Sequence, residues 1–206
     1  MSRTERDERL AYAKAHANEY RSSLGALADS PYSPWDMAEF AALSANSPFT
    51  RARAAWRATR GVHGVQEIAK TLQVCGVGPT TLKAEYCEGI RGLSLTELPR
   101  PPYAAHRAGH PIRGLGYSKY SFAACLIDPL GADVVCIDTW MYQAYNGRVP
   151  DAGWFRRPAA YVALEGVIVS EAHVVNLPPF AYQWAVWDLA RGVRTSHEFL
   201  WEPHRA

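Results

Sequence analysis

The sequence lacks the features of a membrane protein, a disulfide scaffold or a metalloprotein. No apolar run among its 206 residues reaches the roughly 18 that a membrane span needs. No C-x-x-C pair occurs, and the four cysteines are far apart: Cys75, Cys87, Cys125 and Cys136. We therefore expect buried thiols, no iron–sulfur cluster and no other cofactor. The seven histidines show no metal-ligand spacing, so no metal site is expected.

Two further absences concern localisation and strands. The charged start MSRTERDERL has no apolar signal core, so we expect a cytoplasmic protein without a membrane partner. Period-two alternation, which predicts half-buried strands, is scarce, and only residues 133–137 look extended. Apolar residues at helical spacing instead predict helices, which lie at about 5–27, 35–45, 49–60, 65–74, 80–89, 108–127 (with a glycine turn), 138–145, 158–175 and 178–191. The expected fold class is all-α.

Acidic residues are missing from two stretches, although the net charge of the chain is only +2. The stretches are residues 40–66 and 98–127, and their charged residues are all basic: Arg51, Arg53, Arg57 and Arg60, then Arg100, Arg107, Arg113 and Lys119. Such stretches suit a polyanion. Two solvated surface faces are the alternative interpretation.

The second stretch contains a glycine turn, Gly114-Leu115-Gly116, directly before a predicted helix. Glycine has no side chain, so backbone amides at such a turn can approach an anion closely. Lys119 follows in the first turn of the helix, and Asp138 comes nineteen residues later, where it can cap the next helix. A lysine and a carboxylate beside a phosphate-binding turn are suited to attack on a nucleotide.

This block resembles the helix-hairpin-helix (HhH-GPD) DNA glycosylases of base excision repair, most nearly the 8-oxoguanine DNA glycosylase/AP lyases. The resemblance implies that Lys119 is the nucleophile, that Asp138 is the catalytic carboxylate, and that Gly114 and Gly116 bind a DNA phosphate. The family pattern V-D-x-H reads I-D-T-W here, with Trp140 in place of histidine. The hairpin reads G-x-G-x-x-K, one residue longer than the commoner form.

The resemblance covers about residues 36–192. The segment L-S-A-N-S-P-F at 43–49 is similar to the family's L-S-x-N/Q segment, and Asn46 falls on the position that fills the gap left by a flipped base. A helix cap before Pro48 is the alternative role of Asn46. The family fold implies one two-lobed domain over 1–206, with the site in the cleft between the lobes. About 36–145 would hold the hairpin and active site, and the N-terminal helix with 158–192 would complete the second lobe.

Other DNA contacts are expected at basic and small polar positions near these motifs, namely Arg51, Arg53, Arg113 and Ser118. Trp140 either stacks on an extruded base or packs in the core. A second glycine turn, Gly76-Val77-Gly78-Pro79, precedes Lys83, but no aspartate follows at the required spacing. We interpret it as a helix–helix connection able to touch DNA.

The prediction is a monomeric, nucleoid-associated DNA glycosylase that flips a damaged or modified base out of duplex DNA and excises it. A Schiff base on Lys119 would add AP lyase activity by β-elimination. Three alternatives remain open: a glycosylase for phage-type modified bases, a non-catalytic hairpin DNA-binding protein, and a helical interaction protein.

Overall fold

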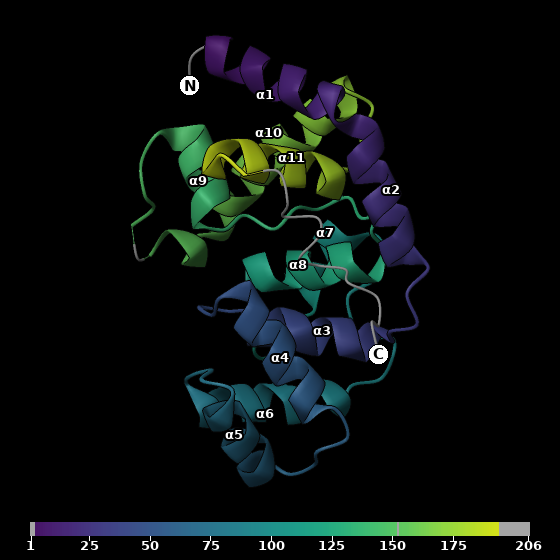
Figure 1. Cartoon of the computed structure of the whole chain (residues 1–206), viewed down its shortest axis with the longest axis vertical. Helices are drawn as coiled ribbons and strands as arrows, with labels where there is room; N and C mark the ends of the chain where they lie inside the picture. Colours follow the sequence, from purple (N-terminus) through teal and green to yellow (C-terminus); the bar gives the residue numbers. More distant parts are fainter. Residues whose placement is uncertain (1–2, 152, 194–206) are drawn as a thin grey trace. The chain divides into compact units, whose positions relative to one another are not determined.

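The computed structural model describes residues 3–151 and 153–193, and these residues form helices without a strand (Figure 1). This confirms the all-α prediction. The helices are α1 (Arg3–Ala15), α2 (Ala17–Ala28), α3 (Pro34–Leu43), α4 (Phe49–Thr59), α5 (Val65–Val74), α6 (Thr80–Arg91), α7 (Tyr103–Gly109), α8 (Tyr117–Ile127), α9 (Thr139–Asn146), α10 (Pro158–Val174) and α11 (Pro179–Arg191), with a 3₁₀ turn η1 (Trp154–Arg156).

Two details of the helix prediction are wrong. The helix expected over 5–27 is two helices, because the backbone at His16 leaves helical geometry with φ −108° and ψ 12°. Neither proline nor glycine marks that break, so the periodic pattern runs across it. Helix α7 was not predicted as a separate element. It is short, and it begins directly after Pro102, which occupies its N-cap position.

The chain divides into two compact units. Residues 31–127 form one, which we call the hairpin unit because it contains both glycine turns. The described residues of 1–30 and 128–206 form the other, which we call the terminal unit. The chain passes from the hairpin unit to the terminal unit after Ile127, so the segment 36–145 contributes to both.

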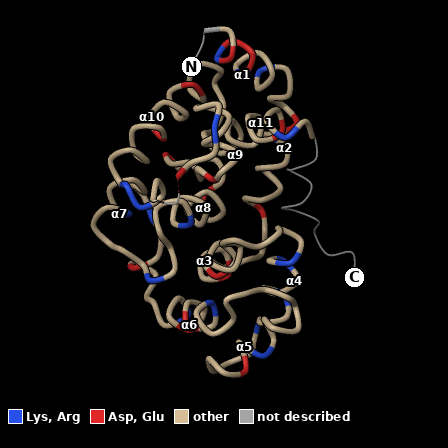
Figure 2. Tube along the Cα trace, turned by 90° about the vertical axis from the view of Figure 1, so that its left-hand side faces the viewer, with Lys and Arg blue, Asp and Glu red and all other residues tan. Residues whose placement is uncertain are grey.

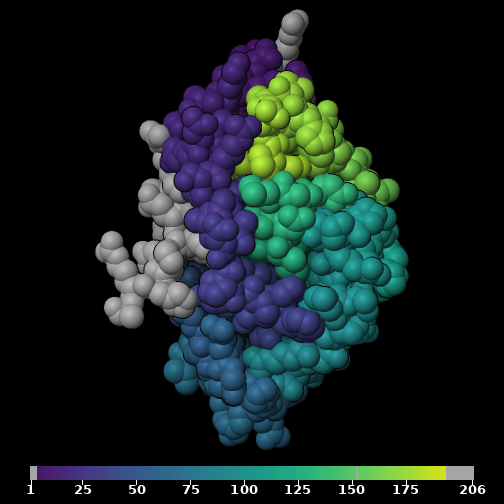
Figure 3. All heavy atoms as spheres, turned by 90° about the vertical axis from the view of Figure 1, so that its right-hand side faces the viewer, coloured from purple at the N-terminus to yellow at the C-terminus, as the bar shows by residue number. Residues whose placement is uncertain are grey.

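Helix α3 is the central helix of the hairpin unit and packs against α4, α6 and α8. It begins at a capping box, in which Ser33 and Asp36 satisfy each other's backbone amides. Its Phe40 ring lies 5.1 Å from Phe49 and 6.0 Å from Phe122, measured between ring centroids, so α3, α4 and α8 share one aromatic cluster. In the space-filling view, the blue part of the chain that contains α3 borders the teal part that contains α6 (Figure 3).

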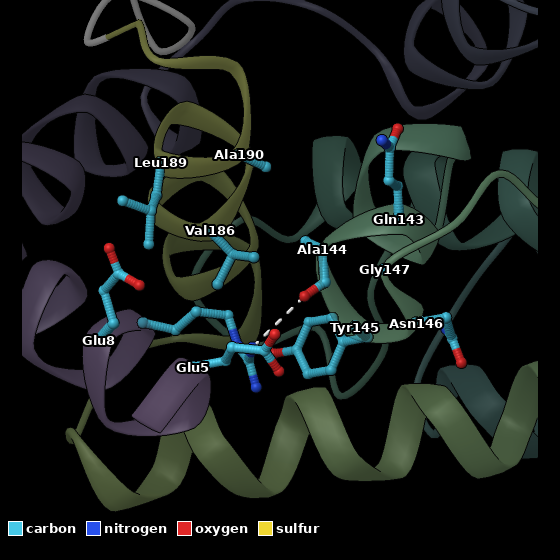
Figure 4. Close-up of a pocket in the computed structure, with 11 residues that line it drawn as sticks. Glu5, Glu8, Gln143, Ala144, Tyr145, Asn146, Gly147, Val186, Leu189 and Ala190 are labelled. Atoms are coloured by element: carbon cyan, nitrogen blue, oxygen red, sulfur yellow. Dashed lines mark hydrogen bonds between the residues drawn. The ribbon is translucent and has the colours of Figure 1, made fainter. Parts of the chain in front are cut away.

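A buried ionic group holds the terminal unit together. The Glu171 carboxylate on α10 lies 3.3 Å from the Arg9 guanidinium and accepts hydrogen bonds of 2.7 Å from both Tyr145 and Tyr182. Arg9 also donates to the Ala144 carbonyl at 3.4 Å, beside a pocket of about 460 Å³ between α1, α9 and α11 (Figure 4). These contacts fix the C-terminal end of α9, whose N-terminal end carries Asp138.

No single helix among residues 3–151 and 153–193 is long and apolar enough to cross a membrane. Within this described part of the chain, only α10 and α11 taken together reach that length and composition, and they are bent by 99° at their junction.

Candidate active site

The glycine turn at 112–115 is a tight hairpin between α7 and α8. Ile112 and Leu115 pair as an isolated antiparallel bridge, with a 3.0 Å hydrogen bond from the Leu115 amide to the Ile112 carbonyl. Gly114 has φ +91°, which a type II turn requires at its third position. A Cβ atom at Gly114 would stand 2.5 Å from Cγ of Tyr86. Gly114 is therefore required by both its backbone conformation and the neighbouring ring.

Gly116 has a different role from Gly114. Its φ is not positive, and a Cβ built on it has no atom within 4 Å. Its carbonyl accepts the first hydrogen bond of α8, from the Tyr120 amide at 2.8 Å. Neither strain nor contact within the described chain thus demands glycine at 116. Open space at the start of a helix suits an anion, because the helix dipole and first-turn amides favour negative charge there.

Lys119 is the third residue of α8, and its side chain points toward the end of α3. Its Nζ donates a 3.0 Å hydrogen bond to Ser44 Oγ, and Ser44 in turn donates to the Ala41 carbonyl at 2.7 Å. Nζ also lies 5.4 Å from the centre of the Phe122 ring. The structure therefore brings the predicted nucleophile to the L-S-A-N segment, a contact across 75 residues of sequence.

Asn46 lies exposed in the connection between α3 and α4, with φ +53°. Asparagine is one of the few residues that adopt this left-handed conformation readily. The alternative role as a helix cap is wrong, because Pro48 occupies the N-cap of α4 and no side chain caps that helix. Filling the gap of a flipped base stays a prediction for Asn46.

Asp138 belongs to the terminal unit, whereas Lys119 belongs to the hairpin unit. The predicted cap is confirmed: Asp138 is the N-cap of α9, and its Oδ1 accepts a 2.8 Å hydrogen bond from the Met141 amide. The side chain is half-buried. Asp138 thus has a fixed rotamer at a helix N-terminus, where negative charge is favoured.

The extended residues 134–137, which precede Asp138, are held by side chains rather than by a neighbouring strand. Glu165 accepts from the Val135 amide at 3.1 Å, and Gln183 accepts from the Cys136 amide at 2.7 Å. The Tyr161 hydroxyl accepts from the Ile137 amide and donates to the Val135 carbonyl, both at 2.9 Å. Buried backbone groups need such partners. Single polar residues inside apolar helices were the sequence signal for these anchors.

Trp140 is 44% exposed in the first turn of α9, two residues after Asp138. The guanidinium of Arg191 lies 5.9 Å from the Trp140 ring centre and 4.6 Å from the Trp187 ring centre. Trp140 is therefore not a core residue, and an aromatic face of this kind can stack on a base. Arg191 is not among the site residues predicted from the sequence.

Two basic residues of the acid-free stretches form ion pairs at the surface. Arg60 pairs with Asp36 at 3.3 Å, and Arg113 pairs with Glu85 at 2.5 Å. Arg51 and Arg57 are exposed on α4, Arg53 is half-buried on the same helix, and Ser118 is half-buried at the start of α8. Figure 2 shows basic positions along α4.

The second glycine turn, residues 75–79, connects α5 and α6, and Lys83 follows on α6. Lys83 is only 3% exposed, so its amine is not a surface phosphate contact. Burial, and then the nearby charge of Lys119, lower the pKa of Lys83 to about 8.

The cysteines and other potential ligands give no metal centre within the described residues. Cys87, Cys125 and Cys136 are buried, and no described cysteine forms a disulfide. Burial raises the pKa of the Cys87 thiol to about 12, so it stays protonated at neutral pH. No three His, Cys, Asp or Glu side chains converge among residues 3–151 and 153–193.

The fold is that of helical DNA glycosylases. The 8-oxoguanine DNA glycosylase of Thermotoga maritima superposes with a TM-score of 0.71 at 16% identity, over 91% of this chain and 98% of that one. The 8-oxoguanine glycosylase/lyase of Methanocaldococcus jannaschii, solved with a 15mer DNA containing 8-oxoguanine, gives 0.63 at 19% identity, over 91% and 89%. No protein-family model and no curated protein sequence matches the chain. The structures confirm the fold that the hairpin resemblance implied.

Proposed function

We propose that this protein is a DNA glycosylase that removes a damaged or modified base from duplex DNA. The hydrogen bond between Lys119 Nζ and Ser44 Oγ carries this proposal. It joins the hairpin lysine to the segment that bears the exposed Asn46, and a glycosylase that works through a lysine adduct needs that lysine near the residue that replaces the flipped base. A protein that only bound phosphate would need no such pairing.

In the proposed reaction, the turn at Gly114 and the start of α8 bind a backbone phosphate, and the exposed arginines of α4 add salt-dependent affinity. Lys119 Nζ attacks the sugar C1′ and gives up a proton as the new bond forms. The N-glycosidic bond breaks, and its electron pair leaves with the base, which takes up a proton. The carboxylate of Asp138, directed by its bond to Met141, stabilises positive charge that develops on the sugar.

AP lyase activity would follow from the same intermediate. In the adduct with Lys119, the C1′–O4′ bond breaks, O4′ takes up a proton, and an iminium forms between Nζ and C1′. Loss of a proton from C2′ then expels the 3′ phosphate oxygen by β-elimination, and hydrolysis of the imine restores the amine. We propose that the protein acts as a monomer, without a cofactor, in the nucleoid of the cytoplasm.

We propose 8-oxoguanine as the first base to test, because the names of both superposed proteins contain it. Trp140 would stack on the extruded base. A phage-type modified base is the second candidate, since Trp140 stands where the family pattern has histidine.

Base release from a panel of duplexes tests the function. The panel contains 8-oxoguanine, uracil, hypoxanthine, oxidised pyrimidines and hydroxymethylated pyrimidines, each tested with wild type and Lys119→Gln. We expect release of one base by wild type and its loss in the variant, with duplex binding retained. Binding of every duplex without any release would instead favour the non-catalytic hairpin protein.

A further inference from the structure

Lys83 is a buried cation that the proposed reaction does not use. Its Nζ donates to the Leu43 carbonyl at 2.8 Å, the Ala45 carbonyl at 2.6 Å and Ser47 Oγ at 2.8 Å. An ammonium group has three donors, so these bonds satisfy all of them. The three acceptors lie in one turn of five residues, 43–47, which we call the 43–47 turn.

Burying this ammonium is costly, because its three acceptors are neutral oxygens and its charge lies near that of Lys119. An apolar side chain of similar length would fill the space without that cost. Leu43, however, is the last residue of α3. The last carbonyls of a helix have no hydrogen-bond donor within the helix. Lys83 supplies donors there from α6, a helix about 40 residues away in sequence.

The 43–47 turn carries two residues of the proposed site. Lys83 binds on both sides of Asn46, at the Ala45 carbonyl and at Ser47 Oγ. Asn46 itself is exposed and has a left-handed backbone. Ser44, in the same turn, accepts the hydrogen bond from Lys119. One buried ammonium therefore fixes the backbone beneath both the gap-filling residue and the hydroxyl that orients the nucleophile.

We propose that Lys83 is a positioning residue for base excision, which holds the 43–47 turn so that Asn46 and Ser44 keep their places. This proposal rests on the proposed function. Lys83 does not contact DNA, and it acts only by holding the 43–47 turn in place.

The first test needs no enzymatic activity. Amide hydrogen exchange of residues 44–47 is compared in wild type, Lys83→Met and Lys70→Met. Lys70 is a matched control, because it is exposed on α5 and pairs only at the surface, with Glu67. We expect at least roughly tenfold faster exchange in the turn for Lys83→Met, since roughly 1.4 kcal/mol of lost local stability gives a factor of ten. Unchanged exchange would overturn the proposal.

The second test separates positioning from general stability. Single-turnover base release is measured for Lys83→Met, Asn46→Ala and the double variant, on the duplex that wild type processes. A misplacement of about 1 Å can cost roughly 100-fold in rate, so we expect losses of that order, and duplex binding within about twofold of wild type for Lys83→Met, which does not touch DNA. The double variant should lose little more than Asn46→Ala alone, because both changes remove the same contribution.

Full additivity of the two losses would overturn the proposal, as would full activity of Lys83→Met. If Lys83→Met does not fold, Ser47→Ala carries the same tests, because it removes one acceptor at a partly exposed position and leaves the ammonium in place. Faster exchange in the turn together with an inactive wild type on every duplex would contradict the proposed function, while the structural role of Lys83 would stand.

Discussion

Replacing Gly114 by alanine should destabilise the protein through two separate effects. Its φ of +91° lies in the left-handed region, which costs an L-residue roughly 1–2 kcal/mol. The new methyl group would also stand 2.5, 2.8 and 2.9 Å from Cγ, Cδ1 and Cβ of Tyr86. Overpacking of this kind costs about 1–3 kcal/mol. We therefore expect a loss of about 2–5 kcal/mol in the free energy of unfolding.

The measurement is thermal or urea unfolding of Gly114→Ala beside Gly116→Ala. A loss of that size lowers the melting temperature of a protein of this length by roughly 4–20 °C. Gly116→Ala is the matched control, because it has neither a positive φ nor a neighbouring atom within 4 Å, and its stability should change by less than about 0.5 kcal/mol. Its effect should appear in DNA affinity instead, if a phosphate approaches the start of α8.

Adding Tyr86→Ala to Gly114→Ala separates the two effects. Loss of the ring removes the contacts at 2.5 and 2.8 Å but leaves the Tyr86 Cβ contact and the backbone strain. The double variant should therefore recover part of the loss, with a coupling of about 1 kcal/mol or more. A Gly114→Ala protein as stable as Gly116→Ala would refute the description of this turn.

Three further changes test other parts of the site. Tyr161→Phe removes the hydrogen bonds of the tyrosine hydroxyl to the Ile137 amide and the Val135 carbonyl, so we expect about 1–3 kcal/mol of destabilisation by urea titration and slower base release. Asp138→Asn keeps an N-cap of equal quality, so its melting temperature should match wild type while single-turnover base release falls by about 100-fold or more. A fully active variant would show that Asp138 serves only as a helix cap. The pKa of Lys83 falls from 10.5 to about 8 on folding, so the unfolded chain binds more protons at this lysine between those values, and the contribution of Lys83 to stability should rise from pH 8 to 10.5. That rise should be absent in Lys83→Met, and an identical pH profile would contradict burial of the charge.

Local features of the fold were predictable from the sequence because their causes are local. The bounds of α5 matched the predicted 65–74, and the start of α9 was marked by a capping aspartate. A Gly-x-Gly turn before an apolar helix indicated the hairpin. The difference between Gly114 and Gly116 was not visible, since it depends on a tyrosine from another helix.

Contacts between distant elements were not predictable. The sequence shows only that Lys83 follows the second glycine turn. Its hydrogen-bond acceptors lie about 40 residues earlier, so its buried position could not be predicted. The side chains that bind the backbone of residues 134–137 also come from other helices. The sequence shows Glu165 and Gln183 as polar residues within apolar stretches, but it does not show which backbone amides they bind. The break at His16 has no local marker, because neither proline nor glycine causes it.

The most direct test of the account is to identify the residue that becomes covalently attached to DNA. Wild type is incubated with a duplex that contains an abasic site, the Schiff base is reduced with borohydride, and the adduct is located by peptide mass spectrometry. We expect an adduct on Lys119 and none in Lys119→Gln. An adduct on Lys83 or another lysine, or undiminished base release by Lys119→Gln, would contradict the assignment of Lys119 as the nucleophile.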